Sequence, residues 1–280
     1  MSDIKFVTTF HEPGMVEYGQ RFINSFAKHV DKNIHLIVYV EDCWPDNPDP
    51  LQIIIKDQKE LLKLMAFKER WKDVPKANGK CPWPERRPRD HHKEFKWHAV
   101  RFANKVYTVF QEAEDPIINW LVWIDADTVV HSDWSYDQIK NLLPRDKWIT
   151  YVGRGVGTQT WPECGFYGLN VRDRMCKQFL EEFERYYEEA EKGIFTLEEW
   201  HDSFVFGHIL NTMKVKYPNV LDYSEHIYNR TAKTGGGGHP LINSVLGTWL
   251  DHLKGVRKTE GSSRKKDLLG PRSEKYWNDI

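Results

Sequence analysis

The order of apolar runs at the start of the chain constrains the fold more than any other feature. Apolar runs at residues 4–9 and 34–40 are typical of buried strands, and a third strand is expected at 52–55. Between the first two runs, apolar residues recur at helical spacing from 18 to 26. This strand–helix–strand order predicts the α/β class, with a mostly parallel sheet flanked by helices.

The composition is that of one large domain without a global charge. With 280 residues and 40% hydrophobic content, the chain can bury a substantial core. Its 40 Lys and Arg residues nearly balance 41 Asp and Glu residues, so no overall field points to nucleic acid or membrane. No apolar run approaches the roughly 20 residues of a membrane span and no apolar signal region opens the chain, which predicts a cytoplasmic protein. The four cysteines have no Cys-x-x-Cys spacing and are expected to be reduced thiols.

The chain divides into a core and two basic segments. We expect residues 1–258 to form one domain, with an exposed, proline-rich basic insertion at 66–97, followed by a basic C-terminal tail at 259–280. Four consecutive glycines at 235–238 indicate a mobile loop. The periodicity further predicts helices at 92–111, 179–192 and 242–253, and strands at 148–152 and 166–171.

A short apolar run at residues 121–124 ends in two carboxylates, Asp125 and Asp127. The run is rich in β-branched and aromatic residues, which is typical of a buried strand. Because side chains at i and i+2 point the same way along a strand, both carboxylates should face one side of its end. In an open α/β sheet, ligands bind in the crevice beyond the carboxyl ends of the strands. The pair therefore marks the candidate site.

Two chemistries use paired acids at such a position. Haloacid-dehalogenase phosphatases use Asp-x-Asp-x-Thr/Val as nucleophile and acid, and Asp125, Asp127 and Val129 fit that motif locally. Against this interpretation, at least two predicted strands precede the motif and no matching acidic pair follows it. In a nucleotide-sugar site, the carboxylates instead hold a divalent cation that neutralises the charge on the departing diphosphate. Hard oxygen ligands favour Mg²⁺ or Mn²⁺.

Further motifs resemble those of the GT-A fold glycosyltransferases, in which an Asp-x-Asp at the end of a central strand binds the metal of a UDP-sugar. The matching residues are Thr8 and Thr9 after the first strand, Arg101 and Lys105 before the acid pair, and His252, Gly255 and Lys258 in a His-x-x-Gly-x-x-Lys pattern. The resemblance implies a Rossmann-like sheet, Mn²⁺ or Mg²⁺ as cofactor, and a UDP-sugar donor such as UDP-glucose.

The resemblance also implies a role for each matching residue. The metal ligands are Asp125, Asp127 and His252. The expected donor-binding residues are Thr8, Thr9, Glu41, Arg101, Lys105, Asp125, Gly255 and Lys258. Structural explanations remain open for the same motifs: a strand end for the threonines, an exposed basic pair on a helix, and a helix C-terminus capped by Gly255.

Two acid-bearing segments are assigned to the acceptor side. An inverting transferase needs a general base near the acceptor hydroxyl, whereas a retaining enzyme of this fold can dispense with one. Asp202 is the first candidate for the base and Glu163 the second, although Asp202 also suits the first turn of a helix. The expected acceptor-binding residues are Trp161, Glu163, Cys164, Gly165, His201, Arg86, Arg87 and Arg89.

Among GT-A enzymes, the segments 18–25, 99–105 and 251–255 resemble bacteriophage glycosyltransferases related to base J glucosyltransferase. These enzymes glycosylate hydroxymethylated pyrimidines in DNA, which implies double-stranded DNA bearing 5-hydroxymethyl-cytosine or 5-hydroxymethyl-uracil as partner. Residues 66–97 carry ten basic and five acidic residues, and 254–272 carry seven and two, which favours contacts with DNA phosphates. The alternatives are a transferase acting on polysaccharide, glycolipid or protein, and an inactive nucleotide-sugar-binding module.

Overall fold

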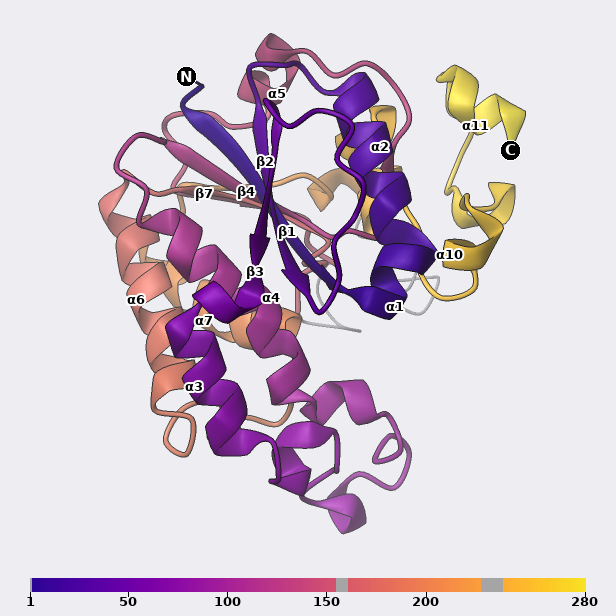
Figure 1. Ribbon diagram of the computed structural model, residues 1–280. Helices are drawn as coiled ribbons and strands as arrows, with labels where there is room; N and C mark the ends of the chain where they lie inside the picture. The colour runs from indigo at the N-terminus through magenta and orange to yellow at the C-terminus, as the bar shows by residue number, and fades with distance from the viewer. Residues whose placement is uncertain (1, 155–160, 228–238) are drawn as a thin grey trace.

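The computed structural model describes residues 2–154, 161–227 and 239–280, and its framework is a mixed α/β sheet with strand order β3-β2-β1-β4-β7-β6-β8 (Figure 1). A separate pair of strands, β5 and β9, lies beside it. The strands are β1 (Ile4–His11), β2 (His35–Glu41), β3 (Ile53–Asp57), β4 (Trp120–Ile124), β5 (Thr128–Val130), β6 (Ile149–Tyr151), β7 (Phe166–Asn170), β8 (Val220–Asp222) and β9 (Leu250–His252).

Most of the strands in the large sheet are parallel. Strands β3, β2, β1 and β4 pair in parallel, as do β6 and β8, whereas β7 runs antiparallel to both β4 and β6. The predicted α/β class, a mostly parallel sheet flanked by helices, is confirmed. Strand β1 has β2 on one side and β4 on the other, so the order of the strands switches at β1. Such a switch opens a crevice at the carboxyl ends of the strands.

Helices cover both faces of the sheet because each strand sends alternate side chains to opposite faces. Phe6 of β1 packs in one apolar cluster with α2, and Val7 packs in the other with α3, α4, α6 and α7. The helices are α1 (Glu12–Gly14), α2 (Gln20–His29), α3 (Leu62–Trp71), α4 (Ala99–Ala113), α5 (Tyr136–Asn141), α6 (Arg174–Glu188), α7 (Asp202–Lys216), α9 (Pro240–Asn243), α10 (Arg257–Glu260) and α11 (Lys275–Asp279).

The basic segment 66–97 forms a lobe that is packed where it meets the rest of the protein and exposed over most of residues 84–95. It begins within α3 and continues through short 3₁₀ turns that lie beyond the ends of α3 and α4, away from the sheet (Figure 1). Trp97 is fully buried, and Trp71 packs edge-on against Phe195. The lobe also binds the loop before α7, where the Trp200 amide donates to the Lys96 carbonyl at 2.6 Å. Aromatic packing therefore anchors a segment whose charged residues remain largely exposed.

The predicted helix over 242–253 is wrong. After α9, a 3₁₀ turn (Val245–Thr248) leads into β9, which pairs antiparallel with β5 so that His252 lies opposite Thr128. The apolar spacing suited a helix, but the backbone of this segment bonds to a strand more than a hundred residues earlier. Gly255 has φ 60° and follows a strand, so it does not cap a helix as one interpretation proposed. The predicted loop at 235–238 lies outside the described residues.

The C-terminal segment holds β9 in place. Asp251 accepts hydrogen bonds from the Ser263 amide at 2.7 Å and from the Tyr276 hydroxyl at 2.7 Å. Trp277 is buried, and its Nε1 donates to the Gly247 carbonyl at 2.6 Å. Residues 259–280 thus pack against the strand that carries His252. Nowhere in the described residues is a helix both long and apolar enough to cross a membrane.

Candidate metal and donor site

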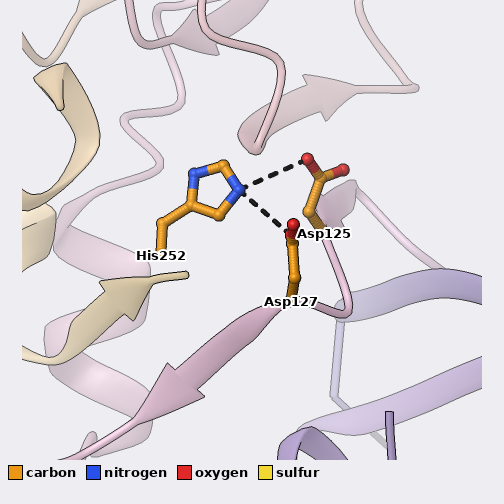
Figure 2. A group of neighbouring side chains, drawn as sticks. All are labelled: Asp125, Asp127 and His252. Atoms are coloured by element: carbon orange, nitrogen blue, oxygen red, sulfur yellow. Dashed lines mark hydrogen bonds and ion pairs between the residues drawn. The ribbon is translucent and has the colours of Figure 1, made fainter. Parts of the chain in front are cut away.

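Three side chains from separate elements meet beside the carboxyl end of β4. Asp125 follows β4, Asp127 precedes β5, and His252 ends β9, and one ligand atom from each lies within 4.8 Å of the others. His252 Nε2 is 3.1 Å from Asp127 Oδ1 and 3.6 Å from Asp125 Oδ2 (Figure 2). The pairing of β5 with β9 produces this meeting, and the Leu253 amide reinforces it by donating to the Asp127 carbonyl at 2.7 Å.

A glycine makes room for the imidazole. A Cβ atom at Gly165 would lie 2.5 Å from His252 Cε1 and 2.8 Å from Nδ1, so any larger residue would displace the ring. The Gly165 carbonyl also accepts a hydrogen bond from the Asp125 amide at 2.9 Å. We expected Gly165 to bind the acceptor, but it directly contacts the proposed ligand His252.

Two lysines orient the carboxylates. Lys105, on α4, lies 3.0 Å from Asp125 Oδ1, which also accepts a hydrogen bond from Trp123 Nε1 at 2.7 Å. Lys258, on α10, lies 3.0 Å from Asp127 Oδ2. Each carboxylate therefore has one oxygen held by a cation, while its other oxygen faces His252 Nε2. In metal sites, residues that do not touch the metal commonly orient its ligands by hydrogen bonds, and the two lysines are placed to orient the aspartates in that way.

Neighbouring charged groups stabilise the ionised forms of Asp127 and Lys105. Burial opposes ionisation of Asp127, but His252 and Lys258 outweigh it and hold the pKa of this carboxyl below its ordinary value. Burial likewise disfavours charged Lys105, yet Asp125 and Asp202 together raise its pKa well above the ordinary value. The site thus presents Asp127 as an ionised carboxylate. Two carboxylate oxygens and an imidazole nitrogen form a donor set that suits Mn²⁺ well and also suits Mg²⁺.

A cleft of about 180 Å³ opens beside these groups, at the carboxyl ends of β1, β2 and β4. The donor-binding candidates that line it are Thr9, Glu41, Arg101, Lys105, Asp125 and Lys258. Thr8 is fully buried and does not line the cleft, because successive residues of β1 face opposite sides of the sheet. Gly255 lies in the turn between His252 and Lys258.

The cleft also contains residues that we did not assign to the site from the sequence. They are Phe10, His11, Tyr18, Gln58, Phe102, Asn104, Trp123 and Ala126. Trp123 could have been found, because it lies two residues before Asp125 and therefore faces the same side of the strand. Gln58 could not have been found in this way, because it follows β3 and lies at the cleft only because β3 packs in the same sheet as β1 and β4.

Three of the residues predicted on the acceptor side, Asp202, Cys164 and Glu163, are buried close to the candidate metal ligands. Asp202, the first residue of α7, is buried, and its carboxylate lies 2.8 Å from Lys105 Nζ. Cys164 is buried with its carbonyl accepting from the same ammonium group. Glu163 is buried and ion-paired with Lys254 and Arg154. These three residues thus lie beside Lys105 or His252 of the candidate metal site, and neither Glu163 nor Asp202 lines the cleft.

The other acceptor candidates lie towards the lobe. His201 is the N-cap of α7, with Nδ1 accepting from the Phe204 amide, and Trp161 packs edge-on against its ring at 5.3 Å. Arg87 pairs with Glu198 at 2.8 Å and with Glu199 at 3.4 Å. The remaining two candidates, Arg86 and Arg89, are exposed. Arg87 is therefore held by acids of the loop before α7, whereas Arg86 and Arg89 are open to solvent.

No protein-family model and no curated protein sequence matches this chain significantly. Solved structures do match. The apo structure of the bifunctional glycosyltransferase WbbM aligns with 80% of this chain at 16% identity and a TM-score of 0.43, and the alignment spans 39% of WbbM. The apo structure of mouse xyloside xylosyltransferase 1 aligns with 83% of this chain at 10% identity and a TM-score of 0.45, and covers 93% of that protein. Similarities this weak assign no function.

Proposed function

We propose that this protein is a metal-dependent glycosyltransferase that moves a sugar from a UDP-sugar to a hydroxyl acceptor. The observation that carries the proposal is that Asp125, Asp127, Lys105 and Lys258 line one cleft, while buried His252 lies beside the two carboxylates. A nucleoside diphosphate has the complementary chemistry, because its anionic oxygens suit both a divalent cation and an ammonium group.

Different residues around the cleft would bind different parts of a UDP-sugar. Asp125, Asp127 and His252 would hold Mn²⁺ or Mg²⁺, and that cation would neutralise the charge of the departing diphosphate. Lys258 would add a positive charge on the diphosphate side, and Arg101 lines the same cleft. The rings of Tyr18 and Phe102 also line it and offer flat surfaces for packing a base or sugar.

The phosphatase interpretation of the acid pair receives less support from the geometry. A nucleophilic carboxylate needs an oxygen free to attack phosphorus. Asp125 Oδ1 accepts from both Lys105 and Trp123, and its other oxygen faces His252. A histidine facing both acids from a distant strand instead forms a group of three side chains that could hold a metal ion.

As the acceptor we propose a hydroxymethylated pyrimidine in double-stranded DNA. The support is that exposed Arg86 and Arg89 lie on the lobe, and that the lobe packs against the loop leading into Asp202. Phosphate contacts from such a lobe would orient a duplex without reading its sequence. A hydroxyl of a polysaccharide, glycolipid or protein is the alternative acceptor.

The test is incubation with Mn²⁺, a panel of nucleotide sugars, and either 5-hydroxymethyl-pyrimidine DNA or unmodified DNA of the same sequence. We expect UDP release together with a mass gain of one sugar on the modified nucleoside alone. UDP release without DNA modification would move the acceptor to the polysaccharide, glycolipid or protein class. Absence of UDP release and of UDP binding in Mn²⁺ would refute the transferase.

A further inference from the structure

We propose that Glu163 is a positioning residue for His252, whose carboxylate keeps the imidazole proton on Nδ1 and leaves Nε2 free for a divalent cation. This inference rests on the proposed function, because it assigns a role within the same metal site. It also replaces the role predicted from the sequence, in which Glu163 was a second candidate for the general base.

The position of Glu163 separates it from the cleft. It lies in the segment before β7, where its amide donates to the Val152 carbonyl at 2.7 Å, and it is 4% exposed. Oε1 is 3.9 Å from His252 Nδ1, and Oε2 accepts from Lys254 and Arg154. Glu163 therefore faces the side of the imidazole opposite Asp125 and Asp127.

If His252 binds a metal through Nε2, the proton of its neutral imidazole must be on Nδ1. Nε2 faces the two aspartates, and Cε1 lies over Gly165. Nδ1 is buried and has no hydrogen-bond partner among the described residues, and the Glu163 carboxylate is the acid that faces it. A neutral imidazole carries its proton on one nitrogen, so ligation through Nε2 requires the proton on Nδ1. The Glu163 carboxylate favours this tautomer by its charge, since 3.9 Å between Oε1 and Nδ1 is too long for a hydrogen bond.

Neighbouring cations maintain the charge of Glu163. Arg154 and Lys254 both form ion pairs with Glu163 Oε2. An ionised acceptor suits the protonated Nδ1. A buried carboxylate already paired with two cations is poorly placed to take a proton from an acceptor hydroxyl in the cleft.

The experiment measures Mn²⁺ affinity by titration calorimetry for the wild-type chain and for Glu163→Gln, which retains the side-chain volume and removes the charge. Loss of such an outer partner raises the metal Kd by about 10- to 100-fold. The matched control is Glu199→Gln, since Glu199 is also buried, also paired with a lysine and also next to a histidine, at His201, but lies outside the ligand set. We expect Glu199→Gln to retain the wild-type Mn²⁺ affinity.

A second measurement uses the wild-type protein, so that it stands even if Glu163→Gln does not fold. Nitrogen NMR of ¹⁵N-histidine-labelled protein with saturating Mg²⁺ should show His252 protonated at Nδ1 and unprotonated at Nε2. Protonation at Nε2, or wild-type Mn²⁺ affinity in folded Glu163→Gln, would overturn the positioning role. Wild-type protein that binds no Mn²⁺ would instead refute the proposed metal site itself, so the two failures are distinguishable.

Discussion

Replacing Gly165 with alanine tests the site without removing any ligand. The added Cβ would lie 2.5 Å from His252 Cε1, whereas ordinary van der Waals contact begins near 3.4 Å, so one group must retreat by about 0.9 Å. The imidazole is the end of a side chain, whereas Gly165 is fixed by the Asp125 amide hydrogen bond, so we expect the ring to move. Because metal–ligand distances hold to within about 0.2 Å, this shift removes Nε2 from its ligand position.

We therefore expect Gly165→Ala to weaken Mn²⁺ binding by about 10- to 100-fold, similar to the loss of an outer partner of a ligand. Titration calorimetry measures the affinity, and circular dichroism in chelator checks the fold. The matched control is Gly168→Ala in β7, where the new Cβ would lie 2.7 Å from Leu143 and Thr150 side-chain atoms but near no ligand. The reasoning is refuted if folded Gly165→Ala binds Mn²⁺ like the wild type, or if Gly168→Ala loses as much affinity.

Three further predictions concern catalysis and DNA. Asp127→Asn should lower Mn²⁺-dependent UDP release by about a hundredfold or more, since the cation that neutralises the departing diphosphate loses a charged ligand; near-normal release would contradict its role. If Asp202 is the general base, Asp202→Asn should lower kcat in steady-state assays while UDP-sugar affinity is retained; a matching loss of affinity would show instead that Asp202 acts through its ion pair with Lys105 on donor binding. In DNA-binding titrations, Arg86→Ala with Arg89→Ala should reduce the log–log salt slope by up to about two units. Arg87→Ala, whose side chain pairs with acids, should not change it, and salt-independent binding would refute the DNA acceptor.

Much of the sheet is predictable because its strands are local apolar runs. The runs at 4–9, 34–40 and 121–124 each form a buried strand. Asp125 and Asp127 both lie near His252, but they belong to the turn between β4 and β5, so their common direction does not come from strand alternation. Strand order follows less directly, since β7 inserts antiparallel between β4 and β6.

The features of the site that the sequence does not predict depend on contacts between distant segments of the chain. Strands β5 and β9 have three residues each, too few for a periodic pattern, and apolar residues around β9 happened to match a helix. The inward direction of Glu163 depends on Lys254 and Arg154, which no spacing in the sequence links to it. The bridge from Lys105 to Asp202 joins α4 to α7 and is likewise fixed only by packing.

The affinity of the wild-type protein for UDP, measured by titration calorimetry in Mn²⁺ and again in excess chelator, tests the central claim most directly. If Asp125, Asp127 and His252 hold the cation that binds the diphosphate, UDP should bind in Mn²⁺ and should lose most of its affinity when the metal is removed. Equal UDP affinity in Mn²⁺ and in chelator, or no UDP binding in either, would contradict the account.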